Sequence, residues 1–131
     1  MTDTQVYIVD PNKTERDALL EKLSTINYKV QALGSGKDLL RKLKREGRPI
    51  VILDLDVEDM DAFDLIPKLR DKNKDVQLIT ITHNTSAKMR KKVARAGVMF
   101  HSTKPKHLLQ LQNILNVTLE FENLKGQQAV M

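Results

Sequence analysis

Short apolar runs alternate with segments of helical periodicity along the whole chain. Residues 5–9 form the first run, QVYIV, and the turn residues Asp10, Pro11 and Asn12 close it. After this turn, apolar residues recur at the three- and four-residue spacing of a helix. The same alternation predicts strands over residues 5–9, 28–33, 50–55, 76–81 and 98–102, and helices over residues 12–26, 35–47, 64–71, 86–96 and 106–124.

Polar residues mark the starts of the first two helices. Asn12 followed three residues later by Glu15 resembles a capping box, and Ser35 with Asp38 forms a second helix cap. The segment GSGK at residues 34–37 lacks the spacing of a phosphate-binding loop, so the helix cap explains it better.

Five β-α units of this kind favour one parallel sheet. The predicted strands are almost continuously apolar, as expected where helices cover both faces of the sheet. We therefore expect an α/β fold with a doubly wound five-stranded parallel sheet, of the flavodoxin-like (βα)5 type. The length of 131 residues fits one domain. We expect this domain over residues 1–120, with residues 121–131 as an extension of the last helix.

Composition narrows the functional classes. The chain has no cysteine, which excludes disulfides, a thiolate metal site and a cysteine nucleophile. No apolar run has the length of a membrane span and the first residues lack signal-peptide character, so we expect a soluble, cytoplasmic protein. The formal charge of +5 favours nucleic-acid binding, but aromatic residues make up only 4% and tryptophan is absent, which argues against a base-stacking surface.

Polar side chains follow four of the predicted strands. Asp10 follows the first strand, Asp54 lies at the end of the third, Thr82 and His83 follow the fourth, and Lys104 follows the fifth. In a doubly wound sheet these strand ends form the ligand-binding edge. A carboxylate there can act as a nucleophile toward a phosphoryl group, given a divalent cation, a fixed positive charge and a hydrogen-bond donor. Lys104 supplies the fixed positive charge, and Thr82 supplies the hydrogen-bond donor.

Other kinds of site fit the sequence less well. The spacing of His83, His101 and His107 matches no zinc-binding pattern, and we expect His107 to begin the last helix on a solvated face. A hydrolase of the Ser-His-Asp type is disfavoured because the sequence has no GxSxG turn.

The segments VYIVDPN, VILDLDVEDMDAFDL, LITIT and TKP resemble the receiver domain of bacterial two-component response regulators, the CheY-like superfamily. The resemblance covers about residues 5 to 120. It implies a signalling domain rather than an enzyme, which accepts a phosphoryl group on Asp54 from a histidine kinase or a phosphotransfer protein. The domain would then switch the face formed by its fourth helix, fifth strand and fifth helix.

The resemblance also implies roles for the other residues at this edge. Thr82 is the switch hydroxyl, Lys104 senses the phosphoryl group, and His101 occupies the position of an aromatic switch residue. The implied ligands of Mg²⁺ are Asp10, Asp54 and the main-chain carbonyl of Asp56. The pair Lys104-Pro105 resembles a lysine-proline pair whose peptide bond is typically cis.

Several positions depart from the family pattern. Pro11 replaces an acid, so the Mg²⁺ site is weakened unless the lost carboxylate is partly replaced by Asn12, Asp56 or Glu58. His101 replaces Tyr or Phe and could titrate near neutrality. His83 replaces a small residue, and its bulk could restrict access to Asp54. A degenerate receiver that binds a partner without phosphorylation is therefore the alternative function.

Two further segments suggest partners. Residues 88–95, KMRKKVAR, contain five basic residues in eight, which fits either a solvated helix or a surface that docks an acidic partner or DNA phosphate. No helix-turn-helix remains outside the five β-α units, so sequence-specific DNA binding by this chain alone is not expected. In the last helix, Leu108, Leu111 and Leu115 should face the sheet. A second apolar seam could form a dimer contact or lead to an output domain, and it comprises Ile114, Val117, Phe121 and Leu124.

Overall fold

The computed structural model describes residues 4–26 and 28–130, and in the last helix it describes side chains as far as Phe121 except that of Leu119. Strands and helices alternate through these residues. The elements are β1 (Gln5–Val9), α1 (Lys13–Leu23), β2 (Lys29–Leu33), α2 (Gly36–Lys42), β3 (Ile50–Asp54), α3 (Ala62–Lys72), β4 (Gln77–Thr82), α4 (Ala87–Ala96), β5 (Phe100–Thr103) and α5 (His107–Val130).

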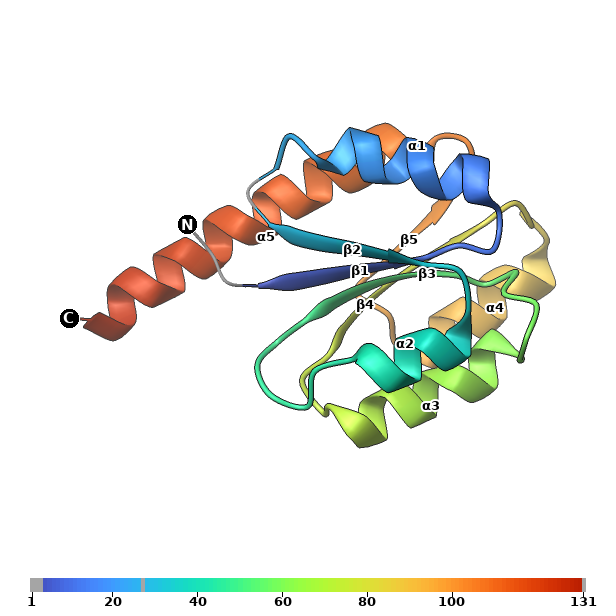
Figure 1. Ribbon diagram of the computed structural model, residues 1–131, viewed down its shortest axis with the longest axis horizontal. Coiled ribbons are helices and arrows are strands. Elements are labelled where there is room, and N and C mark those ends of the chain that lie inside the picture. Colours follow the sequence, from blue (N-terminus) through green and yellow to red (C-terminus); the bar gives the residue numbers. More distant parts are fainter. Residues whose placement is uncertain (1–3, 27, 131) are drawn as a thin grey trace.

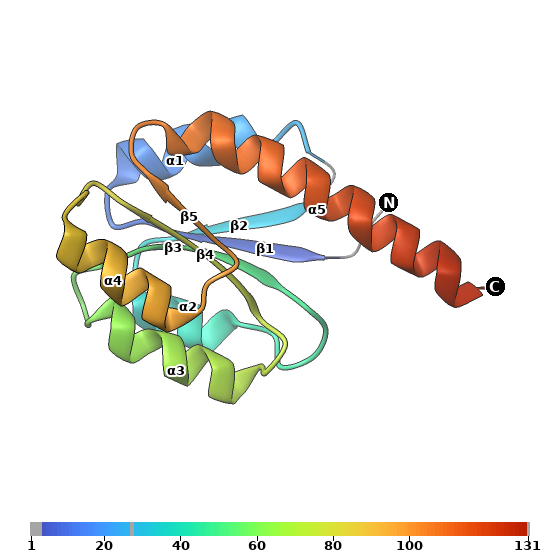
Figure 2. The same cartoon turned by 180° about the vertical axis from the view of Figure 1, so that it is seen from behind.

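The strands form one parallel sheet in the order β2-β1-β3-β4-β5. The order reverses direction after β2, which is the mark of a doubly wound sheet. Helices α1 and α5 cover one face, and α2, α3 and α4 cover the other (Figure 1 and, from behind, Figure 2). The expected flavodoxin-like (βα)5 fold is confirmed.

Two apolar cores lie on opposite faces of the sheet, because successive side chains of a strand point to opposite faces. Val51 and Leu53 of β3 face the core beneath α2, α3 and α4. Ile50 and Ile52 face the core beneath α1 and α5. Each core takes alternate residues of the strand, so together the two cores require an apolar residue at almost every position. The sequence of β3 is therefore continuously apolar up to Asp54.

Helix boundaries follow the caps more closely than the apolar pattern. Asn12, Ser35 and Ser86 are N-caps whose side chains accept main-chain N–H hydrogen bonds, and Gly97 ends α4 in the left-handed conformation at φ 65°. The residues GSGK therefore form a helix start, as expected. Helix α3 begins two residues earlier than predicted because the Asp61 carboxylate accepts from the Phe63 N–H and caps it.

Other boundaries differ from the sequence-based prediction. Helix α2 ends at Lys42 rather than near Gly47, because the next residue, Leu43, leaves the helical conformation. Strands β4 and β5 each end one residue later than predicted, at Thr82 and Thr103. Both strands extend because main-chain pairing between them continues from Ile79 and Phe100 to these two residues.

Helix α5 packs on the sheet through its first half. Leu111 and Leu115 are fully buried and Leu108 is partly buried, as predicted. Val117 and Phe121 of the second seam are exposed, whereas Ile114 packs against the core; Leu124 lies outside the described side chains. The boundary between residues 1–120 and the extension stays a prediction. None of the helices, over the described residues, is both long and apolar enough to span a membrane.

The expected solvent exposure of His107 is wrong. His107 begins α5, as predicted, but it is only 4% exposed. Burial lowers the pKa of His107, and the nearby positive charge of Lys104 lowers it further. The start of α5 is buried because His107 follows the buried Lys104 by only three residues after β5, and α5 packs back against β5.

We expect Asp59→Ala to lower the free energy of unfolding by about 1 kcal/mol, the usual contribution of a helix cap. The Asp59 carboxylate accepts from the main-chain N–H groups of Gly36 and Lys37, each at 3.0 Å, and so caps α2 from the β3–α3 loop. Urea unfolding measures the change. Glu58→Ala in the same loop is the matched control and should change stability little; equal losses in both variants would contradict the capping role.

We expect His107→Leu to flatten the pH dependence of stability between pH 7 and pH 5. Because the folded protein holds the pKa of His107 below the ordinary value, the unfolded chain binds the proton first as the pH falls, and stability is lost on the acid side. Urea unfolding across this range tests it. Asn113→Leu, on the exposed side of α5, should keep the wild-type slope; an unchanged slope in His107→Leu would contradict the prediction.

Candidate functional site

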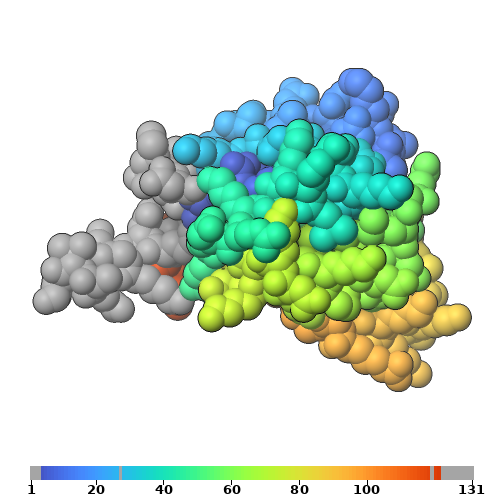
Figure 3. Space-filling view, turned by 60° about the horizontal axis from the view of Figure 1, so that its bottom comes forward, coloured from blue at the N-terminus to red at the C-terminus, as the bar shows by residue number. Residues whose placement is uncertain are grey.

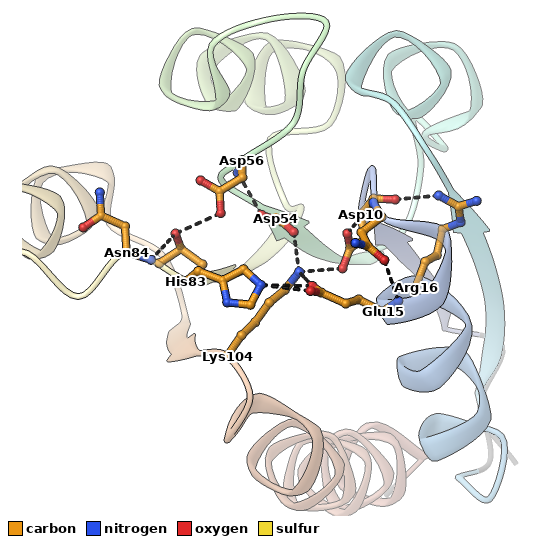
Figure 4. Close-up of polar contacts among 10 residues, drawn as sticks. Asp10, Glu15, Arg16, Asp54, Asp56, His83, Asn84 and Lys104 are labelled. Carbon is orange, nitrogen blue, oxygen red and sulfur yellow. Dashed lines mark hydrogen bonds and ion pairs between the residues drawn. The ribbon is translucent and has the colours of Figure 1, made fainter.

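The candidate site lies at the edge of the sheet where β1, β3, β4 and β5 end (Figure 4). Asp10 follows β1, Asp54 is the last residue of β3, Thr82 is the last of β4, and Lys104 follows β5. Because β3 lies between β1 and β4, Asp54 stands between the flanking groups. All four side chains are buried. The structure thus brings these residues to one edge, and their chemical roles stay predictions.

The Lys104 ammonium lies at the centre of a cluster of carboxylates. Its Nζ donates to Asp10 Oδ2 at 2.8 Å and to Asp54 Oδ2 at 2.6 Å, and it also donates to Glu15 Oε2. Burial by itself would lower the pKa of Lys104, but the hydrogen bonds to the three carboxylates raise it above its ordinary value. The ammonium therefore stays charged. The peptide bond that follows, Lys104-Pro105, is cis, as expected.

Both oxygens of the Asp54 carboxylate have a donor. Oδ2 accepts from Lys104, and Oδ1 accepts from the main-chain N–H of Asp56 at 2.8 Å. Burial raises the pKa of Asp54 to about 6, although both donors favour the charged form. At neutral pH this carboxylate is therefore mostly ionised, yet more basic than an exposed aspartate, and both properties suit a nucleophile.

Glu15 completes the cluster, a role that the sequence pattern did not indicate. Its main-chain N–H donates to the Asn12 cap at 3.0 Å, as expected of a capping box. The reciprocal bond is missing because the Glu15 carboxylate turns toward Lys104 and His83 instead. Hydrogen bonding to Lys104 holds the pKa of Glu15 below its usual value. One feature of the sequence could have indicated this role. Glu15 is an acidic residue in the first turn of α1, close to Pro11, which replaces an acid of the family pattern.

The carboxylates form a set of oxygen donors suited to a hard cation. Asp10, Glu15 and Asp54 each offer one oxygen, and these oxygens lie within 4.8 Å of one another. Mg²⁺ prefers such ligands. With all groups ionised, three carboxylates and the Lys104 ammonium leave a formal charge of −2, so the cluster can balance a divalent cation. The donor set therefore fits Mg²⁺, and Glu15 adds a carboxylate to this cluster beside Asp10 and Asp54. Partial replacement of the lost ligand by Asn12, Asp56 or Glu58 stays a prediction.

Asp56 and Thr82 lie next to each other at the rim of the site. The Thr82 hydroxyl donates to Asp56 Oδ2 at 3.3 Å and accepts from the Asn84 N–H at 3.0 Å. The Asp56 carboxylate is exposed and does not join the acidic cluster. The role expected for Asp56, that its main-chain carbonyl binds Mg²⁺, stays a prediction.

His83 connects the β4–α4 loop to α1. Its Nε2 lies 2.9 Å from Glu15 Oε1, and its side chain is 58% exposed. The ring therefore lies beside Glu15 on the solvent-exposed side of the cluster, and the predicted restriction of access to Asp54 stays a prediction.

His101 is held on the α4 side of the sheet. It pairs with Thr80 across β4 and β5, and its Nδ1 lies 2.7 Å from the Thr80 hydroxyl. Burial lowers the pKa of His101 below its ordinary value, which favours the neutral ring. Its role as a switch residue stays a prediction.

Comparisons with known proteins agree with this geometry. The chain matches the family described as response regulator receiver domain over residues 6–116. It is 27% identical over 126 residues to the sensor protein EvgS of Escherichia coli K12, a match that covers 91% of this chain and 10% of that protein. It is 24% identical over 119 residues to the DNA-binding transcriptional regulator NtrC of Rhizobium meliloti, covering 91% of this chain and 25% of the regulator. The chain thus spans a quarter or less of these relatives.

Solved structures share the fold. A CheY-like receiver domain protein from Methanospirillum hungatei superposes with a TM-score of 0.80 at 19% identity, covering 95% of this chain and 99% of that one. The BeF3-activated receiver domain of DrrB, a Thermotoga maritima protein, gives a TM-score of 0.79 at 22% identity. This match covers 91% of this chain and 99% of that one. With the family match over residues 6–116, the chain belongs to the response regulator receiver domains of two-component signalling.

Proposed function

We propose that this domain accepts a phosphoryl group on Asp54 from a histidine kinase or a phosphotransfer protein. The observation that carries the proposal is the environment of Asp54, a buried and mostly ionised carboxylate whose Oδ2 lies 2.6 Å from the Lys104 ammonium. Family membership supports it, because receiver domains are signalling domains.

Phosphoryl transfer at this site forms one bond and breaks one. An Asp54 carboxylate oxygen attacks phosphorus while the bond from phosphorus to the donor histidine nitrogen breaks, and that nitrogen keeps the electron pair. The Lys104 ammonium and the Thr82 hydroxyl then donate hydrogen bonds to the phosphoryl oxygens, which requires Thr82 to leave Asp56. These two side chains position the group that is transferred.

Mg²⁺ fits the proposal as a partner of the acidic cluster. Asp10, Glu15 and Asp54 would hold it, together with the main-chain carbonyl of Asp56, and when bound it would offset negative charge on the phosphoryl oxygens. The Lys104 ammonium shares the same carboxylates, so cation binding competes with its hydrogen bonds. This competition and the loss of an acid at Pro11 both argue for weak binding.

The proposed switch links Thr82 to the face formed by α4, β5 and α5. Thr80 and Thr82 lie on the same side of β4, and Thr80 contacts His101 of β5. Movement of Thr82 toward a phosphoryl group would shift this part of β4 and thereby the packing of His101 beside α4. The sensor and regulator relatives support a histidine kinase and an output domain as partners. We also propose a homodimer through α4 and α5 as the other arrangement, and a cytoplasmic site of action.

The main test is phosphorylation by acetyl phosphate and Mg²⁺, followed by intact-mass measurement. We expect the mass of one added phosphoryl group on the wild type and none on Asp54→Asn, because the amide is not a nucleophile of this kind. Asp56→Asn is the matched control and should keep the added mass, since its side chain lies outside the cluster. No added mass on the wild type would favour the degenerate receiver that binds partners without phosphorylation.

A second test addresses Glu15. We expect Glu15→Gln to weaken Mg²⁺ binding about tenfold, as loss of a ligand or its close support typically does, and Pro11→Asp to strengthen it. Chemical shifts of main-chain amides during a Mg²⁺ titration give the affinity directly. Glu21→Gln, an exposed acid on α1, should leave it unchanged; wild-type affinity in Glu15→Gln would show that Glu15 is not a ligand.

A further inference from the structure

A groove runs between α3 and α4, on the face of the sheet away from α1 and α5. Its floor is apolar and consists of Phe63, Ile66, Pro67 and Ala96. Arg70, Lys92 and Arg95 form its rim, and the groove encloses about 360 Å³. Figure 3 shows α3, in yellow-green, beside α4, in orange, on this face of the molecule. None of the residues of the candidate phosphorylation site lines this groove.

A second hollow adjoins the groove at Arg70. The Arg70 guanidinium donates to the carbonyl of Gly97 at 3.0 Å, so it bridges α3 to the end of α4 and lines both hollows. The second hollow encloses about 560 Å³, and its lining includes Arg48, Lys74 and the exposed side chain of Met99. The two hollows together form one surface strip that combines apolar and cationic side chains.

The basic side chains of this strip form no ion pairs with the acidic side chains that the structure describes. Among the residues that the structure describes, no ion pair involves Arg48, Arg70, Lys74, Lys92 or Arg95. Asp75 is the one acidic residue that the structure places in the lining. A ligand with several negative charges would therefore meet unneutralised positive charge along the strip.

We infer that this strip docks an acidic amphipathic segment of a partner protein. Apolar side chains of the segment would fill the floor at Phe63 and Ile66, and its carboxylates would meet the cationic rim. DNA fits less well because its phosphate backbone offers nothing to the apolar floor. Lys92 Nζ also lies over the Phe63 ring, 5.6 Å from its centroid, where a stacked base would have to displace it. The inference does not depend on phosphorylation of Asp54.

A designed helical peptide tests this inference, with leucine and phenylalanine on one face and glutamate on the others. We expect it to bind the full chain with an affinity that falls as salt rises and to shift main-chain amide signals of α3 and α4. The variant Lys92→Glu/Arg95→Glu should weaken binding about tenfold or more, because it reverses two rim charges. Lys91→Glu is the matched control, since Lys91 lies on α4 but outside the groove, and it should bind like the wild type.

Other outcomes would overturn the inference. If a peptide of the same composition in scrambled order bound as tightly as the designed peptide, charge alone would explain the binding, and the apolar floor would play no part. Tighter binding of a DNA duplex, with equal losses from the groove variant and Lys91→Glu, would indicate a nucleic-acid surface. Self-association that is lost in the groove variant, without peptide binding, would assign the strip to a second copy of the chain. Absence of amide shifts in α3 and α4 would exclude the groove as the docking site.

Discussion

The hydrogen bonds from the Lys104 ammonium to three carboxylates are the contacts on which the rest of the site depends. Charged groups this deeply buried are tolerated only when they are paired. Lys104 comes from the end of β5, Asp54 from β3, Asp10 from β1 and Glu15 from α1, so one ammonium joins four separate elements. Removing any one carboxylate changes the charge that the others experience.

This pairing also sets the chemistry that is possible. Burial makes Asp54 more basic, while Lys104 keeps it ionised near neutral pH, with its pKa at about 6. The same ammonium donates to carboxylate oxygens that, under the proposed function, would also hold Mg²⁺. In that proposal Glu15 adds a carboxylate to the cluster, whereas Pro11 offers none.

Acidic and basic residues are distributed unevenly between the site edge of the sheet and α4. Six acidic residues lie between Asp54 and Asp64, whereas α4 carries five basic residues and no acidic one. The domain thus presents an acidic rim around its reactive edge and a cationic, partly apolar strip between α3 and α4. The net charge of +5 hides this separation, because the chain outside residues 54–64 carries +11.

The sequence by itself determined the fold class, the order of elements and the strand ends that carry Asp10, Asp54, Thr82 and Lys104, because periodicity and strand termination are local properties. It did not determine the place of Glu15 or the burial of His107. The Glu15 carboxylate, in the first turn of α1, accepts from Lys104, which is 89 residues away along the chain. His107 begins α5, which packs back against β5. Only the tertiary structure decides such contacts, since they require two distant segments to meet at the same edge of the sheet.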